Sequence, residues 1–130
     1  MTLFQKLKGT ALNDFTPVGK KGIVPELQII DTVIGEGEEV PADATITAHY
    51  TGALATDGTI FESSHDSGNP ATFGLNQVID GWTVGVPGMK VGGTRRLIIP
   101  AAMAYGHRRA SAMIAPNSDL VFDIELIAVK

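Results

Sequence analysis

The chain has 130 residues and a formal net charge of -4 at pH 7, and roughly 100 to 150 residues is the commonest size of a domain with one hydrophobic core. Its composition, 44% hydrophobic and 18% charged, excludes an intrinsically disordered tail. The acidic balance argues against a protein that neutralises nucleic-acid phosphates, and the absence of cysteine excludes disulfides and thiolate chemistry.

No stretch of the sequence approaches the roughly 20 apolar residues of a membrane span, and the first residues lack the apolar run of a signal peptide. We therefore expect a soluble, cytoplasmic protein with neither nucleic acid nor a membrane as partner, the alternative being that a leader has been removed. We also expect a monomer.

The first 24 residues differ in composition from the rest, because lysines alternate with Leu and Phe while glycine and Pro17 interrupt any long helix. We interpret residues 1–24 as an N-terminal arm and residues 25–130 as the domain. The arm is expected to pack a few apolar side chains on the domain. A docking or dimerising segment is the alternative.

From Pro25 onward, glycine and proline recur every several residues between short β-branched runs, a pattern typical of antiparallel strands. The last predicted strand is the clearest, since alternate residues are apolar: Leu120, Phe122, Ile124, Leu126 and Ala128. Half-buried strands are also predicted over 27–34 and 45–54, and further strands around 59–62, after the Asp57-Gly58 turn, and over 94–99.

One helix is predicted, over residues 80–90, where Trp82, Val86 and Met89 would form a single apolar stripe. Gly85 and Pro87 make this helix poor by propensity, so packing against the sheet must hold it. The fold class is therefore α+β, with a curved antiparallel β-sheet wrapped around one short α-helix.

The sequence offers little conventional catalytic chemistry. The three histidines, His49, His65 and His107, lack the short spacing of metal ligands, and Ser63-Ser64 lies outside any nucleophile motif. We expect no metal, no cofactor and no covalent intermediate. The unusual feature is a set of aromatic residues within the predicted elements: Tyr50, Phe61, Phe73, Trp82, Tyr105 and Phe122.

Three ordered blocks of sequence carry a family resemblance. They are His49-Tyr50-Thr51-Gly52 with Phe61-Glu62-Ser63-Ser64, then Val78-Ile79-Asp80-Gly81-Trp82 through Ala104-Tyr105-Gly106, then Pro116-Asn117 with Leu120-Val121-Phe122-Asp123. In order and spacing they resemble the FKBP-type peptidyl-prolyl cis-trans isomerases, in the minimal single-domain branch.

The resemblance implies an enzyme that accelerates rotation of X-Pro peptide bonds during protein folding, acting on proline-containing peptides and unfolded clients. It also implies possible binding of macrolides of the FK506 class. By the same resemblance, an apolar pocket would be lined by Tyr50, Phe61, Phe73, Val78, Ile79, Trp82, Tyr105, Ile114 and Phe122.

Roles within that pocket also follow from the resemblance. Trp82 would form the floor beneath the proline ring, while the Ile79 backbone N–H and the Tyr105 hydroxyl would donate to substrate carbonyls. Glu62 would interact with the tyrosines and the twisting amide.

The chain departs from the family pattern at four places. Glu62 replaces a common Asp, Ala71 a common aromatic residue and Ser67 a common Arg, and Ala110 begins an Ala-Ser-Ala run in place of His-Pro-Gly. We expect these changes to weaken macrolide binding more than isomerase activity.

Two other functions fit the same residues. A binding module would keep the pocket but isomerise poorly, and turnover distinguishes it from the enzyme. A structural subunit would assemble through the N-terminal arm, which a mass measurement after deletion of residues 1–24 tests.

Overall fold

The computed structural model describes residues 8–108 and 110–130. Its six-stranded sheet has the order β1-β5-β6-β2-β3, with β4 paired to β2 beside this path, and every paired strand is antiparallel. The strands are β1 (Gln28–Val33), β2 (Thr45–Leu54), β3 (Ile60–Ser63), β4 (Ala71–Gly74), β5 (Thr94–Ile99) and β6 (Leu120–Val129). Two 3-10 turns, η2 (Ser64–Asp66) and η3 (Ala101–Met103), and one helix, α1 (Asp80–Gly85), complete the described elements.

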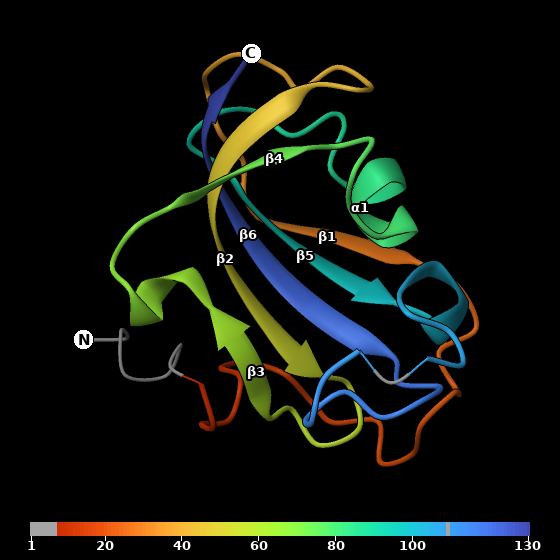
Figure 1. Ribbon diagram of the computed structural model, residues 1–130. Helices are drawn as coiled ribbons and strands as arrows, with labels where there is room; N and C mark the ends of the chain where they lie inside the picture. Colours follow the sequence, from red (N-terminus) through yellow and green to blue (C-terminus); the bar gives the residue numbers. More distant parts are fainter. Residues whose placement is uncertain (1–7, 109) are drawn as a thin grey trace.

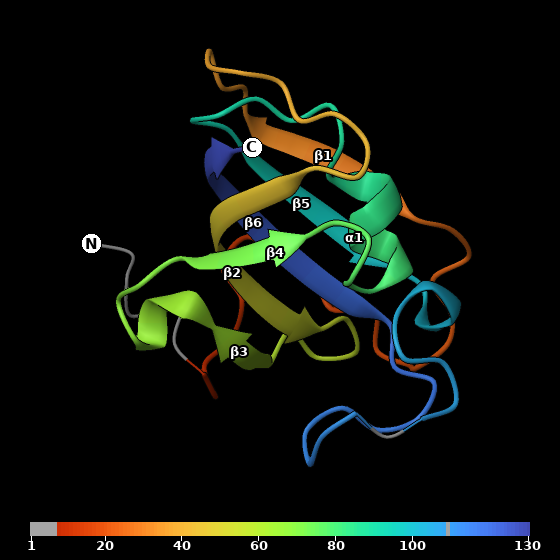
Figure 2. The same ribbon diagram turned by 45° about the horizontal axis from the view of Figure 1, so that its top comes forward.

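The sheet curves around α1, which lies against its inner face (Figure 1, Figure 2). Contact is close because two glycines of α1 face the apolar side chains of β5. A Cβ atom at Gly81 would lie 2.6 Å from Ile99, and one at Gly85 would lie 2.8 Å from Leu97. This close approach fixes the helix and turns Trp82, 3% exposed, into the core. The α+β prediction is therefore confirmed.

The helix is shorter than the sequence pattern predicts. It ends at Gly85, with Val86 as the C-cap, and the chain then turns through Gly88, whose φ of 96° is a left-handed conformation. Pro87 and glycine prevent continuation of the helix. Met89 is nevertheless buried, because the turn returns it to the core.

The predicted alternation of β6 holds over most of the strand, since Leu120, Phe122, Ile124 and Leu126 are all buried. Ala128 is exposed instead of inward, because an irregularity in the β2–β6 pairing near Thr47 shifts the register. A bulge of this kind reverses which face later residues occupy.

The predicted half-burial of residues 27–34 is wrong. Every residue of β1 is exposed. Its position explains this, since β1 is an edge strand that pairs only with β5.

Residues 8–24 lie along the outer face of the sheet and along β3 (Figure 1). Backbone hydrogen bonds join Gly9 and Thr10 to Ile60, and Leu12 is buried beside Ala53, Ala55, Ile60 and Val121. The Arg96 side chain is held by Asp123 at 2.7 Å and also donates to the carbonyls of Asn13 and Asp14. The described part of the arm thus closes the edge of β3 and covers apolar surface.

Candidate active site

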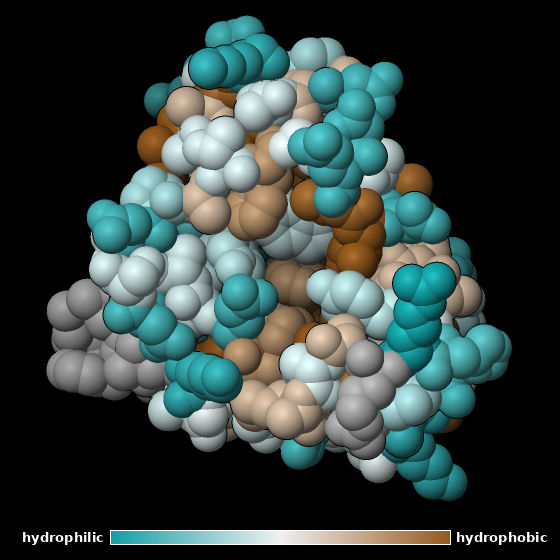
Figure 3. All heavy atoms as spheres, viewed as in Figure 1, coloured by the Kyte–Doolittle hydropathy of each residue, from teal (hydrophilic) through white to brown (hydrophobic). Residues whose placement is uncertain are grey.

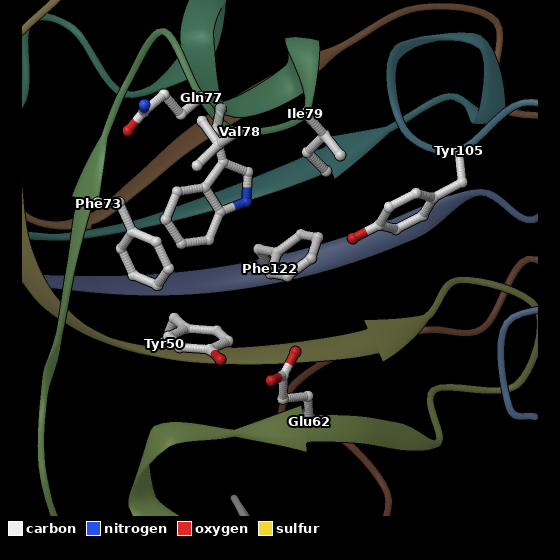
Figure 4. Close-up of a pocket in the computed structure, with 9 residues that line it drawn as sticks. Tyr50, Glu62, Phe73, Gln77, Val78, Ile79, Tyr105 and Phe122 are labelled. Atoms are coloured by element: carbon white, nitrogen blue, oxygen red, sulfur yellow. The ribbon is translucent and has the colours of Figure 1, made fainter. Parts of the chain in front are cut away.

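A cavity of about 440 Å³ opens on the inner side of the sheet, between the start of α1 and strands β2, β3, β4 and β6. Figure 3 shows this face hollowed near its centre, with apolar side chains in the hollow and hydrophilic ones around it. The lining residues are Tyr50, Glu62, Phe73, Gln77, Val78, Ile79, Trp82, Tyr105 and Phe122 (Figure 4).

Aromatic rings form the floor and walls of this pocket. Trp82 is central, because its ring meets those of Tyr50, Phe73 and Phe122 edge to face, at centroid distances of 5.8, 5.0 and 5.4 Å. Tyr50 and Phe73 also meet edge to face, at 5.4 Å. Edge-to-face pairs of this kind stabilise each other beyond simple burial, so the rings hold one another in a fixed apolar box.

Each ring is placed by a different element. Tyr50 projects inward from β2 and Phe122 from β6, which are directly paired neighbours with Tyr50 opposite Ile124. Phe73 comes from β4 and Trp82 from the first turn of α1. The box therefore requires strands β2, β4 and β6 and the helix α1 to be assembled together.

Gly52 makes room for the aromatic residues of β3 and β6. A Cβ atom at this position would lie 2.7 Å from both the Phe61 and the Phe122 rings. Those two rings meet edge to face with centroids 5.8 Å apart. A glycine is thus needed here for the close approach of side chains rather than for backbone conformation.

Polar groups gather at the mouth of the pocket. The Tyr50 hydroxyl faces the Glu62 carboxylate, and the Tyr105 hydroxyl points into the cavity from the opposite side (Figure 4). Burial raises the pKa of Tyr50, and a hydrogen bond to Glu62 together with the negative charge of Glu62 raises it further. Burial and then the Glu62 charge likewise raise the pKa of Tyr105. Both hydroxyls therefore remain protonated, able to donate, at neutral pH.

A backbone donor completes the rim. Ile79 occupies the N-cap position of α1 in an extended conformation, and its carbonyl accepts from the Trp82 N–H at 3.0 Å. The Ile79 N–H itself donates to no acceptor among the described residues. This N–H is thus available to a carbonyl bound in the pocket.

The structure brings eight of the ten predicted site residues together around this cavity. Phe61 and Ile114 are not among them. They line an adjacent cavity of about 510 Å³ that shares Glu62 and Tyr105 with the first. Gln77 lines the pocket but was not predicted, and only its position next to Val78 and Ile79 in the sequence pointed to it.

The departures from the family pattern are found in distinct places. Ala71 lies on β4 but does not line the pocket, and Ala110 lines the adjacent cavity. Ser67 donates a hydrogen bond to the Ser64 carbonyl at 3.1 Å, a local contact that caps η2. Only Glu62 therefore changes the wall of the pocket directly.

Neither a metal site nor a membrane helix is found in the part of the chain that the structure describes. No group of three or more metal-ligating side chains converges there, and none of the helices described is long and apolar enough to cross a membrane.

Comparison with known proteins identifies the family. The family model for FKBP-type peptidyl-prolyl cis-trans isomerase matches residues 36–127. The peptidyl-prolyl cis-trans isomerase FPR2 of Saccharomyces cerevisiae is 40% identical over 132 residues, which cover all of this chain and 92% of the relative. An FK506-binding protein of Streptomyces anulatus is 46% identical over 107 residues, covering 80% of this chain and 86% of the relative.

Other relatives are longer than this chain. FkpA of Aeromonas hydrophila is 46% identical over 112 residues, and this match covers 86% of this chain but 41% of the relative. Among solved structures, a peptidyl-prolyl cis-trans isomerase from Pseudomonas syringae has a TM-score of 0.73 and 36% identity, covering 88% of this chain and 84% of that one.

A curved antiparallel sheet around one short helix, with an aromatic pocket at their junction, defines a peptidyl-prolyl cis-trans isomerase. The chain belongs to the FKBP-type family of these enzymes, as its sequence resemblance predicted. Members of this family act on proline-containing substrates and bind ligands of the FK506 kind.

Proposed function

We propose that the aromatic pocket catalyses X-Pro isomerisation by removing water from the amide and orienting it, with no covalent intermediate. Amide resonance creates a rotation barrier of roughly 18 to 20 kcal/mol. Twisting the bond removes resonance and its charge separation, so an apolar pocket favours the twisted amide over the planar one. The observation that carries this proposal is the closed box of rings around Trp82, which is 3% exposed.

The polar rim supplies orientation. The Ile79 N–H and the Tyr105 hydroxyl flank the pocket and would donate to carbonyls on either side of the proline, with the proline ring over Trp82. Glu62 holds the Tyr50 hydroxyl at the pocket mouth. Orientation of this kind lowers the entropic part of a barrier.

The carboxylate of Glu62 is on a longer side chain than the Asp that is common in the family at this position. It extends from β3 across to the Tyr50 hydroxyl on the neighbouring strand (Figure 4). We propose that this reach narrows the mouth for a bulky macrolide while leaving room for an extended peptide.

The cellular role proposed here is acceleration of proline-limited folding steps in unfolded clients, by a monomeric protein in the cytoplasm. Support for the folding role comes from the exposed mouth of the pocket, since an extended chain can enter it. Support for a monomer comes from the arm, whose described residues cover the β3 edge of their own sheet. Cell fractionation tests the location, and sedimentation before and after deletion of residues 1–24 tests the monomer.

The folding role is tested by refolding a protein whose slow phase is limited by prolyl isomerisation, which uncatalysed takes tens to hundreds of seconds. Catalytic amounts of this chain should accelerate that phase in proportion to its concentration. A macrolide of the FK506 class at saturating concentration should abolish the effect. A slow phase unchanged by the folded protein would refute the folding role.

A further inference from the structure

A cluster of polar side chains outside the pocket is attached to the strand that carries Tyr50. On the outer face of the sheet, the imidazole rings of His49 and His65 stack with centroids 4.3 Å apart and planes 13° from parallel. His49 belongs to β2 and His65 to η2, the turn that follows β3. The pair therefore joins the two strands that supply Tyr50 and Glu62.

Each ring makes a short hydrogen bond. His65 Nε2 lies 2.8 Å from Glu125 Oε2 on β6, and His49 Nδ1 lies 2.8 Å from the Ser64 hydroxyl oxygen. The His65 side chain is only 12% exposed and that of Glu125 is 28% exposed. A hydrogen bond on each ring thus holds the stacked pair in place, and the pair is not freely solvated.

Ser64 connects this cluster to the pocket wall. Its hydroxyl oxygen accepts the Tyr50 backbone N–H at 2.8 Å, and its hydroxyl lies 3.3 Å from the Tyr50 carbonyl oxygen. Ser64 is itself 7% exposed. The same oxygen therefore contacts His49 and both backbone polar groups of the pocket residue Tyr50.

The hydrogen bonds of Ser64 depend on the charge of His49, because the Ser64 hydroxyl carries only one hydrogen. The Ser64 hydroxyl has one hydrogen and faces two acceptors, His49 Nδ1 and the Tyr50 carbonyl. Both nitrogens of a charged imidazole carry hydrogens. A neutral His49 can accept the Ser64 hydrogen, whereas a charged His49 must donate to Ser64, which sends that hydrogen to the Tyr50 carbonyl.

We propose that Ser64 is a positioning residue for the isomerase reaction, holding Tyr50 in the pocket wall under the control of the stacked His49–His65 pair. This inference rests on the proposed function of the pocket. In the active arrangement proposed here, Ser64 donates to a neutral His49 across 2.8 Å and accepts the Tyr50 backbone N–H across 2.8 Å.

Neighbouring charges define how acid would act. Glu125 on β6 faces His65, Asp123 on the same strand is bound by Arg96 of β5 at 2.7 Å, and Asp66 of η2 accepts the Lys8 backbone N–H at 3.3 Å. Glu62 of β3 faces the pocket on the opposite side of the sheet. Glu125 is thus the carboxylate that meets the imidazoles directly, at His65.

Histidine changes charge between about pH 5 and 8. Charging His49 therefore reverses its hydrogen bond with Ser64. The rate of isomerisation should fall as His49 becomes charged.

The test measures cis-trans exchange of an X-Pro peptide without titratable side chains by NMR, from pH 5 to 8, for the wild type, Ser64→Ala and His65→Gln. Ser64→Ala should lower kcat/KM at pH 7.5 about three- to tenfold, which corresponds to roughly one hydrogen bond. The wild-type rate should fall toward pH 5, and His65→Gln, which removes the ring stacked on His49, should lower the rate at pH 7.5 less than Ser64→Ala does.

Ser67→Ala is the matched control, since Ser67 also donates to a backbone carbonyl in this turn but contacts neither His49 nor Tyr50. Its kcat/KM should stay within about twofold of wild type, a smaller change than the three- to tenfold loss expected for Ser64→Ala. The NMR shift of the Tyr50 amide should follow the same titration as the His49 ring in the wild type. This NMR measurement tests the link between His49 and Tyr50 without measuring turnover. Because it uses the wild type, it can be made even if Ser64→Ala fails to fold.

The outcomes separate the two proposals. A wild type without turnover overturns both. If the wild type is active, any one of three results overturns the positioning role alone. In the first, folded Ser64→Ala has the wild-type rate and pH profile. In the second, Ser67→Ala loses as much kcat/KM as Ser64→Ala, and in the third, the NMR shift of the Tyr50 amide does not follow the titration of His49.

Discussion

The Tyr50 hydroxyl and the Glu62 carboxylate meet at the mouth of the pocket, although they come from different strands (Figure 4). The antiparallel pairing of β2 with β3, in which Gly52 lies opposite Glu62, creates this contact. The carboxylate thereby fixes the direction of the Tyr50 hydroxyl in a wall made mostly of apolar and aromatic side chains.

Replacement of Glu62 by Ala should lower kcat/KM while leaving the free energy of unfolding within about 0.5 kcal/mol of wild type, because exposed side chains contribute little to stability. Glu62→Gln should retain part of the rate, since an amide oxygen still accepts from Tyr50. Isomerase kinetics and urea denaturation measure the two effects. Unchanged turnover in Glu62→Ala would show that the carboxylate orients nothing.

The two tyrosines should lose their hydroxyl protons at a higher pH than an ordinary tyrosine. The chain has only two, Tyr50 and Tyr105, and burial with the nearby Glu62 charge raises the pKa of both. Absorbance at 295 nm should therefore show little tyrosinate in the folded protein at a pH near 10, the ordinary value for tyrosine. The urea-unfolded chain is the control and should titrate near that ordinary value.

The same shift has a consequence for stability. At high pH the folded state holds more protons on these tyrosines than the unfolded state, so stability falls as pH rises. Their contribution is complete below about pH 10 and is lost as pH rises through the folded-state pKa values. A folded protein whose tyrosines titrate together with those of the unfolded chain would contradict the interaction of Glu62 with both tyrosines.

Much of the fold was predictable because its strands alternate strongly. Most inward positions of β6 followed from period-two apolar residues, which a half-buried sheet requires, whereas for residues 94–99 only the strand itself was predicted. The helix was predicted too long, since Val86 and Met89 are apolar for reasons of core packing and not of helical periodicity. β4, with four residues, is too short to give a recognisable pattern.

The site was predictable only through family resemblance. Aromatic residues such as Phe73 and Trp82 are far apart in sequence, and no local pattern states that β4 and α1 bring them together. Phe61 and Phe122 share one close contact around Gly52, whose role depends on tertiary approach. The stacking of His49 on His65 could not be predicted for the same reason. Their spacing in the sequence indicated only that they are not metal ligands.

Trp82→Ala should reduce both stability and rate. Removing a large buried ring typically costs about 3 to 5 kcal/mol, and Trp82 contacts three other rings of the pocket. Urea denaturation and isomerase kinetics, done under conditions where the variant is folded, separate the effects. Trp82→Phe should be intermediate in both. A folded Trp82→Ala with full turnover would refute the role of Trp82 as the floor.

Leu12→Ala should reduce stability but not activity. Leu12 is 6% exposed and packs with Ala53, Ala55, Ile60 and Val121 on the outer face, away from the pocket. Truncation of a buried leucine costs about 2 to 5 kcal/mol, whereas Ile30→Ala on the exposed edge strand is a control expected within about 0.5 kcal/mol. Chemical denaturation measures both. Equal stability of Leu12→Ala and wild type would mean that the arm does not hold the sheet.

The most direct measurement of the central claim is the cis-trans exchange rate of a short X-Pro peptide, followed by NMR with increasing amounts of the purified protein. We predict an exchange rate that rises in proportion to protein concentration and falls when a macrolide of the FK506 class fills the pocket around Trp82. A folded protein that leaves exchange at its uncatalysed rate would contradict catalysis by this pocket and would favour a binding module instead.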